Sequence, residues 1–104
     1  MYKIKFNPAA VQQLVGLFEY IAASSTADTA ANYISALIDK CDSLRTFPHR
    51  GVQRDDIRLG MRITNFRKRT VIAFLVEGDT VVILGIFHGG RSYEAILQEE
   101  DESS

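Results

Sequence analysis

The spacing of apolar residues divides the chain into a helical first half and a stranded second half. Residues 2–6 alternate apolar and basic side chains, which predicts a short strand. Asn7 then offers a helix N-cap, and Pro8 suits the first helical position. Helices are predicted over residues 8–23 and 27–46, joined by a short polar turn.

Each predicted helix has an apolar stripe with steps of three and four residues, which is the helical repeat. Two such helices on either side of a short turn favour an antiparallel hairpin. The second helix ends before Pro48, because proline disfavours helical geometry in the residue that precedes it. The stripes are Val11, Leu14, Phe18 and Ile21 in the first helix, and Ala30, Ile34, Leu37, Cys41 and Leu44 in the second.

The second half of the chain changes to a period of two, which is typical of strands. Strands are predicted near residues 57–65, 70–76 and 80–87, after a loop over residues 47–56. The expected fold class is α+β. An N-terminal strand precedes a helix hairpin, and the hairpin packs on a small antiparallel sheet that ends in a three-strand meander.

The strands at 70–76 and 80–87 are apolar on both faces, although a helix hairpin covers only one. Strict alternation would place Val82, Leu84, Ile86 and His88 on one face and Val81, Ile83 and Phe87 on the other. A bare apolar face in a small domain indicates a partner site. The alternative is that the acidic C-terminal tail folds over this face.

Size and composition predict one globular domain over residues 1–97, followed by a disordered acidic tail at 98–104. The single cysteine, Cys41, has no partner for an internal disulfide and is expected in the core. Two widely separated histidines make a poor metal site, and no cofactor motif is present, so neither a metal nor a cofactor is expected. The chain has no signal peptide and no apolar stretch of membrane length, which favours a cytoplasmic location.

The net charge of −1 conceals an uneven distribution. Residues 45–69 carry eight basic side chains and two acidic ones, whereas residues 94–102 carry only acidic charges. A basic middle indicates an acidic or polyanionic partner. The alternative is a solvated basic hairpin with a solvated tail.

The order of elements, with the segments Leu44–Gly51 and Val71–Leu97, resembles the RelE/ParE toxin superfamily and most closely its ParE-like branch. The resemblance implies a cytoplasmic toxin that a cognate antitoxin neutralises. That antitoxin is expected to be small and DNA-binding, with a segment that folds on binding. ParE-like toxins poison DNA gyrase without being enzymes, whereas RelE-like toxins cut messenger RNA on the ribosome. Plasmid stabilisation and growth inhibition are the associated roles, and a homodimer and a toxin–antitoxin hetero-oligomer both stay open.

The candidate site residues are the arginines around the apolar strands, together with His88 and Tyr93, which follow the last predicted strand. The resemblance favours gyrase as the target. The chain lacks the lysine-rich cluster expected of RelE-like toxins, and Tyr93 follows Arg91 by only two residues, unlike the wider spacing in RelE-like chains. The His-x-x-Arg pair of His88 and Arg91 is similar to that of ParE-like chains. In the alternative, purely structural interpretation, His88 caps its strand by a backbone hydrogen bond and Arg91 pairs with Glu94. Arg58 and Arg62 then serve to keep one outer sheet face soluble. An inactive toxin-like binding module is a third alternative. Target or antitoxin binding is assigned to Arg58, Arg62, Arg67, Arg69, His88, Arg91 and Tyr93; under the nuclease alternative Arg62, Arg69, His88, Arg91 and Tyr93 are catalytic.

Overall fold

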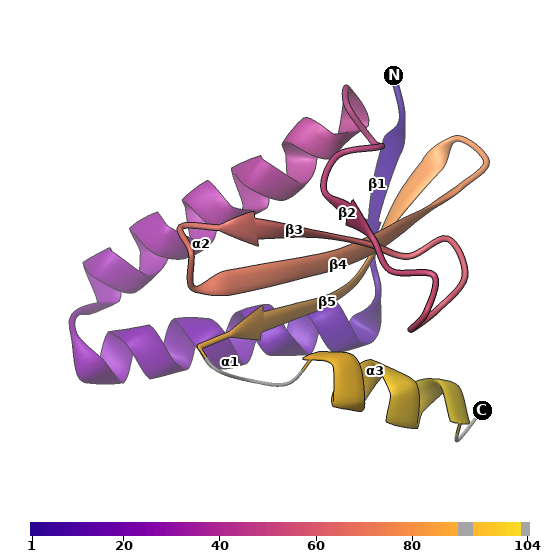
Figure 1. Ribbon diagram of the computed structural model, residues 1–104. Coiled ribbons are helices and arrows are strands. Elements are labelled where there is room, and N and C mark those ends of the chain that lie inside the picture. The colour runs from indigo at the N-terminus through magenta and orange to yellow at the C-terminus, as the bar shows by residue number, and fades with distance from the viewer. Residues whose placement is uncertain (90–92, 103–104) are drawn as a thin grey trace.

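A five-stranded mixed sheet lies between a helix hairpin and a short C-terminal helix (Figure 1). The structure, a computed structural model, describes residues 1–89 and 93–102. The strand order across the sheet is β1-β5-β4-β3-β2. The strands are β1 (Lys3–Phe6), β2 (Val52–Gln53), β3 (Arg62–Phe66), β4 (Thr70–Glu77) and β5 (Thr80–His88).

The predicted α+β fold is confirmed, with one difference in the pairing of the sheet. Strands β2 to β5 are antiparallel, but β1 pairs with β5 in parallel, so the sheet is mixed and not wholly antiparallel. The direction of this pairing depends on how the helix hairpin returns the chain to the sheet, which no local pattern encodes. The predicted loop over residues 47–56 also contains β2, a two-residue edge strand.

The helix hairpin consists of α1 (Pro8–Ser24) and α2 (Ala27–Asp42), and the chain continues as a short 3-10 helix over Ser43–Arg45. Thr26 caps α2, because its hydroxyl accepts a hydrogen bond of 3.0 Å from the backbone N–H of Thr29. Asn7 takes the N-cap position of α1 without a side-chain hydrogen bond.

The main core fills the space between the hairpin and the sheet. The apolar stripe predicted for α2 is confirmed, and its Cys41 is fully buried. The stripe predicted for α1 is half right: Leu14 and Ile21 pack against the core, but Val11 and Phe18 are exposed, and Ala10 and Leu17 are buried in their place. Glu19 is the single charged residue of α1, so the helix is apolar on several sides and its periodicity does not single out one face.

The predicted strand at 57–65 begins later than expected, at Arg62. Residues 57–61 form a turn in which Gly60 has a φ of +81° and its N–H donates to Asp55 Oδ1 at 2.9 Å. Ile57 and Met61 are buried, but Leu59 is 85% exposed. The alternation of apolar residues therefore arose from a turn that buries its two ends, and not from a strand.

A β-bulge in β5 changes which residues share a face. Ala73 pairs with Gly85 and Phe74 pairs with Ile83, so Leu84 has no partner in β4. Beyond the bulge, Ile86 packs in the core under the hairpin and Phe87 packs on the opposite face. The predicted grouping of His88 with Val82 and Leu84 is therefore wrong. His88 lies on the hairpin side with Val81, Ile83 and Ile86.

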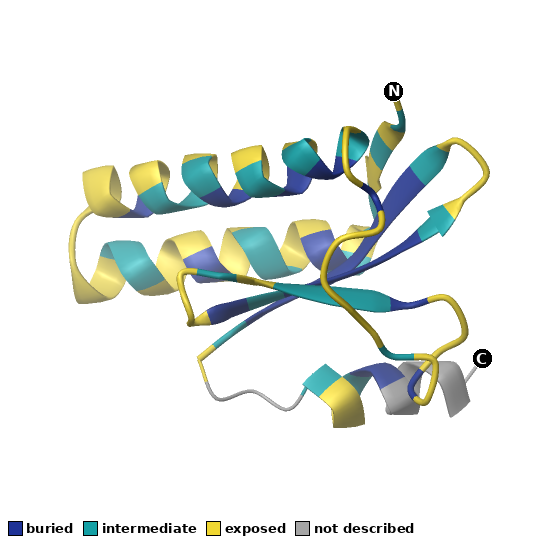
Figure 2. Ribbon diagram, turned by 45° about the horizontal axis from the view of Figure 1, so that its top comes forward, coloured by how far each residue is buried: buried dark blue, intermediate teal, exposed yellow. Residues whose placement is uncertain are grey.

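The second sheet face is covered by α3 (Tyr93–Glu102) and by the turn before β3 (Figure 2). Leu97 is 4% exposed and packs in a second core with Val82, Leu84 and Phe87. The prediction of a bare apolar face is therefore wrong, and the alternative, a C-terminal segment folded over that face, is what the structure contains. The helix continues past Leu97, the predicted end of the folded domain, to Glu102.

Candidate functional site

Two polar clusters lie on opposite faces of the sheet, and each includes residues that the sequence singled out. The first, here called the His88 cluster, consists of Tyr20, Tyr33, Arg67, Thr70 and His88 on the hairpin side. The second, here called the α3 network, consists of Arg54, Asp56, Tyr93 and Glu94. The bulge in β5 separates them, because it directs His88 away from α3.

A chain of hydrogen bonds forms the centre of the His88 cluster. The hydroxyl groups of Tyr33 and Thr70 are 2.6 Å apart, and Thr70 Oγ1 is 2.8 Å from His88 Nδ1. Thr70 is fully buried, and its single hydroxyl proton can serve only one of these two partners. Either Tyr33 donates to Thr70 and Thr70 donates to His88, or both bonds run in the opposite direction.

Aromatic rings and cations surround the His88 imidazole. The ring lies edge-on to Tyr33, with centroids 5.8 Å apart, and 6.2 Å from the Tyr20 ring. The guanidinium of Arg67 lies 5.5 Å above the Tyr33 ring. Burial, and to a smaller extent the Arg69 guanidinium, lower the pKa of His88 below its ordinary value of 6.5. The imidazole is therefore neutral at pH 7, with Nδ1 committed to Thr70.

A cavity of about 530 Å3 lies beside this cluster, between α1 and the end of β5. Its walls include Gln12, Gly16 and Tyr20 from the helix and Ile86 and His88 from the strand. The mixture of amide, phenol, imidazole and aliphatic groups can bind a ligand that is partly apolar and partly hydrogen-bonding.

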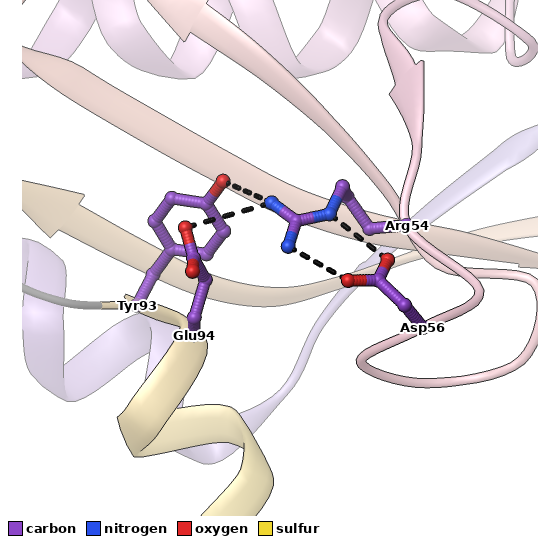
Figure 3. A network of polar contacts seen from close by, with 4 residues as sticks. All are labelled: Arg54, Asp56, Tyr93 and Glu94. Carbon is purple, nitrogen blue, oxygen red and sulfur yellow. Dashed lines mark hydrogen bonds and ion pairs between the residues drawn. The ribbon is translucent and has the colours of Figure 1, made fainter.

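The α3 network ties the C-terminal helix to the turn before β3 (Figure 3). Arg54 makes two hydrogen bonds to the Asp56 carboxylate, at 3.0 and 2.9 Å, and a third of 2.8 Å to the Tyr93 hydroxyl. The Glu94 carboxylate lies 3.5 Å from the same guanidinium. The two bonds to Asp56 fix the orientation of the Arg54 guanidinium, and its bond to the Tyr93 hydroxyl then holds the first turn of α3.

The pKa values of the α3 network follow from these contacts. The hydrogen bond from Arg54 lowers the pKa of Asp56 and, in return, raises the pKa of the guanidinium. Burial raises the pKa of Tyr93 above 10, so its phenol is protonated at neutral pH and accepts the bond from Arg54. The charged Arg54–Asp56 pair and the neutral Tyr93 phenol thus keep their hydrogen bonds at neutral pH.

The remaining candidate residues are dispersed. Arg62 donates to the carbonyl oxygens of His49 and Arg50 and so braces the loop before β2. The sequence predicted that Arg58 and Arg62 share one sheet face. This prediction is wrong, because Arg58 lies in the turn before β3. Arg91 lies outside the described residues.

The expectation that His88 caps its strand through a backbone hydrogen bond is replaced by the side-chain bond to Thr70. The carbonyl of Arg69 instead accepts the N–H of Gly89 at 2.9 Å. Sequence reasoning missed Arg54 and Thr70. Thr70 carried a readable signal, since it is a polar residue that begins an apolar strand.

The part of the chain that the structure describes contains no group of three or more His, Cys, Asp or Glu side chains that could bind a metal ion. A search of the helices among these residues found none with the length and apolar character needed to cross a membrane.

The fold is an α+β domain with a helix hairpin on one face of a mixed sheet, and a family model identifies the family to which the chain belongs. The model for the ParE toxin of the type II toxin–antitoxin system parDE matches residues 4–93. The chain therefore belongs to the ParE toxin family, which confirms the predicted resemblance. A search of curated protein sequences gave no match.

Two solved structures share this fold. The chromosomal ParDE toxin–antitoxin system from P. aeruginosa contains a chain that matches with a TM-score of 0.75 and 18% identity, over 86% of this chain and 97% of that one. The conserved hypothetical protein HP0894 from Helicobacter pylori matches with a TM-score of 0.50 and 15% identity, over 85% of this chain and 94% of that one.

Proposed function

We propose that this protein is the toxin of a toxin–antitoxin module, that it poisons DNA gyrase without being an enzyme, and that a cognate antitoxin neutralises it. Membership of the ParE toxin family supports the gyrase target. The fold shared with a chain of the P. aeruginosa ParDE system supports an antitoxin partner. A toxin that acts on gyrase works in the cytoplasm, and a cytoplasmic location is therefore part of the proposal.

The separation of His88, Tyr93 and Arg62 supports the choice of gyrase over messenger RNA as the target. Cleavage of RNA needs a base, an acid and cations within hydrogen-bond reach of one phosphate. Here His88 lies on the hairpin side of the sheet with its Nδ1 bonded to Thr70, whereas Tyr93 lies on the opposite side with its hydroxyl bonded to Arg54. The Arg62 guanidinium is bonded to loop carbonyls.

Purified gyrase tests the proposal directly. The protein should inhibit supercoiling or accumulate gyrase-cleaved DNA, and it should leave messenger RNA on ribosomes intact. Arg91→Ala should weaken gyrase inhibition by about tenfold or more, because a charged hydrogen bond contributes about 1.5–3 kcal/mol. Lys3→Ala is the matched control, since Lys3 is an exposed cation on the edge strand β1 and pairs with Asp79.

The nuclease alternative predicts a different set of results. Ribosome-dependent cleavage of RNA, lost in Tyr93→Phe while gyrase stays active, would show that the gyrase proposal is wrong. Activity in neither assay, with no effect on growth, would favour the inactive binding module.

The antitoxin is tested separately. The product of the neighbouring gene should form a complex with the protein at micromolar concentration and restore gyrase activity. Light scattering of the free protein and of the complex would distinguish a homodimer from a toxin–antitoxin hetero-oligomer. Absence of a complex would leave the gyrase result unaffected and would reject only the neutralising partner.

A further inference from the structure

The turn between β3 and β4 has an uncommon backbone conformation. The N–H of Arg69 donates to the carbonyl of Phe66 at 3.3 Å, which closes a tight turn with Arg67 and Lys68 at its centre. Both central residues have a positive φ, +52° for Arg67 and +62° for Lys68. Asparagine and glycine are preferred in such turns, because a longer side chain is crowded at positive φ. Strain of this kind is typically retained where the side chains have a function.

The three cations of this turn have no anionic partner. Arg67, Lys68 and Arg69 are exposed, and none of them takes part in the ion pairs of the described residues. Other arginines are used within the protein, since Arg54 is bonded in the α3 network and Arg62 to loop carbonyl oxygens. The cations of the turn are therefore available to an external anion.

Two aromatic rings hold the Arg67 guanidinium in place. It lies 4.9 Å from the centre of the Phe66 ring and 5.5 Å from that of the Tyr33 ring. The two rings pack edge to face with centroids 5.2 Å apart, and the Tyr33 hydroxyl is anchored to the buried Thr70 at 2.6 Å. A guanidinium stacked on a ring keeps its in-plane N–H donors free, and these donors can bind a phosphate by two parallel hydrogen bonds.

The surface around the turn lacks the features of a protein-binding site. Within residues 62–77, which comprise β3, the turn and β4, no large apolar side chain is exposed. Protein interfaces depend on aromatic and apolar anchors, whereas binding to nucleic acid is dominated by contacts between cations and phosphates. Figure 1 shows the turn at the tip of the β3–β4 hairpin, away from α3, where it is accessible to a long polyanion.

We propose that the β3–β4 turn binds the phosphodiester backbone of duplex DNA. Arg67 donates to one phosphate from its aromatic platform, and Lys68 and Arg69 neutralise the phosphates beside it. Cations on successive residues suit this ligand, because duplex DNA carries one negative charge for about every 1.7 Å of its axis. Such contacts carry no sequence information. The choice of DNA over RNA rests on the proposed function, since gyrase holds the DNA that it cleaves.

Titration of a short duplex DNA into the 15N-labelled full chain at low salt tests the proposal without gyrase. The amide signals of Arg67, Lys68 and Arg69 should shift, and those of α3 should not. Fluorescence anisotropy with a labelled duplex then measures the affinity at several salt concentrations. For three phosphate contacts, the logarithm of the association constant should fall with the logarithm of the salt concentration at a slope of about −2.7.

Substitutions of Lys68 separate binding from folding. Lys68→Gly removes one cation and relieves the strained φ, so the Tm should rise by a few degrees while the affinity falls about tenfold and the salt slope changes to about −1.8. Lys68→Arg keeps the charge and should bind DNA as the wild type does. Lys5→Ala is the matched control, because Lys5 is an exposed cation on β1, at the edge of the sheet farther from β3, and its loss should change the affinity less than about twofold.

Several results would overturn the proposal. They are the absence of shifts in the turn at low salt, a salt slope that Lys68→Gly leaves unchanged, and an equal loss of affinity in Lys5→Ala. Tighter binding of a duplex RNA would assign the turn to RNA, and tighter binding of a polyglutamate peptide of equal charge would assign it to an acidic protein.

The inference and the proposed function can fail separately. Inhibition of gyrase by a protein whose turn does not respond to DNA would overturn this inference and leave the proposed function standing. Binding of DNA by the turn, without inhibition of gyrase, would support the inference and reject gyrase as the target.

Discussion

Replacing Thr70 by valine removes one oxygen atom from the centre of the His88 cluster and keeps the shape of the side chain. Thr70 is fully buried, and its hydroxyl serves both Tyr33 and His88, at 2.6 and 2.8 Å. The substitution therefore deletes two hydrogen bonds without opening a cavity. At about 0.5–1.5 kcal/mol for each bond, the free energy of unfolding should fall by about 1–3 kcal/mol.

Urea unfolding at pH 7 measures this loss, and thermal unfolding should show it as a lower Tm. A domain of this size loses roughly 4–8 °C for each kcal/mol. A double-mutant cycle with Tyr33→Phe isolates the Tyr33–Thr70 bond, which should couple the two sites by at least about 0.5 kcal/mol. Strictly additive effects would show that the two hydroxyls do not depend on each other.

Thr64→Val is the matched control. Thr64 lies on β3 opposite Ile72, it is half-buried, and within the described structure its hydroxyl makes no hydrogen bond. Its substitution should change stability by less than about 0.5 kcal/mol. Equal stability of Thr70→Val and the wild type would refute the conclusion that the hydrogen-bond chain holds β4, β5 and α2 together.

Three further predictions concern groups whose contacts differ in kind. Arg54→Ala should accelerate amide hydrogen exchange throughout α3 and leave α2 unchanged, because Arg54 is the group that binds Tyr93 and Glu94; equal protection of α3 would argue against a holding role. The pKa of His88 is lower in the folded chain than its ordinary 6.5, so its stabilising contribution is present above pH 6.5 and lost as the pH falls towards the folded value. The acid-induced loss should be smaller in His88→Gln, as measured by urea unfolding across this range. Burial raises the pKa of the Cys41 thiol to about 12, so a thiol reagent at pH 8 should react with Cys41 only after denaturation.

The elements that could be predicted from the sequence are those in which one local pattern decides the outcome. Helix α2 has a stripe of buried residues from Ala30 to Cys41, which Leu44 continues into the 3-10 helix, so its buried face follows from periodicity. Strands β4 and β5 are apolar on both faces because both faces are covered. In α1, by contrast, apolar residues surround the helix, and the packing partner decides which of them is buried.

The parts that could not be predicted depend on contacts between distant segments. The Asp55 carboxylate accepts a hydrogen bond from the N–H of Gly60 and stabilises a turn over residues 57–61. The apolar residues of this turn alternate as they would in a strand, so the pattern alone predicts a strand there. The bulge at Leu84 exists only in the pairing of β4 with β5, so no spacing within β5 reveals it. Tyr93, which the sequence assigned to target or antitoxin binding, forms a hydrogen bond with Arg54 in the structure. No local pattern pointed to Arg54, because it is one arginine among many in the basic middle of the chain.

The extra residue in β5 has a consequence for how relatives are compared. A homologue whose final strand is one residue shorter would keep the same order of side chains but present its terminal histidine to α3, and not to the helix hairpin. Two histidines in the same alignment column could then occupy opposite surfaces, and an insertion or deletion of a single codon would move a polar group across the sheet without altering its identity. Equivalent residues among these toxins are therefore better assigned by the strand face they occupy than by their position in an alignment.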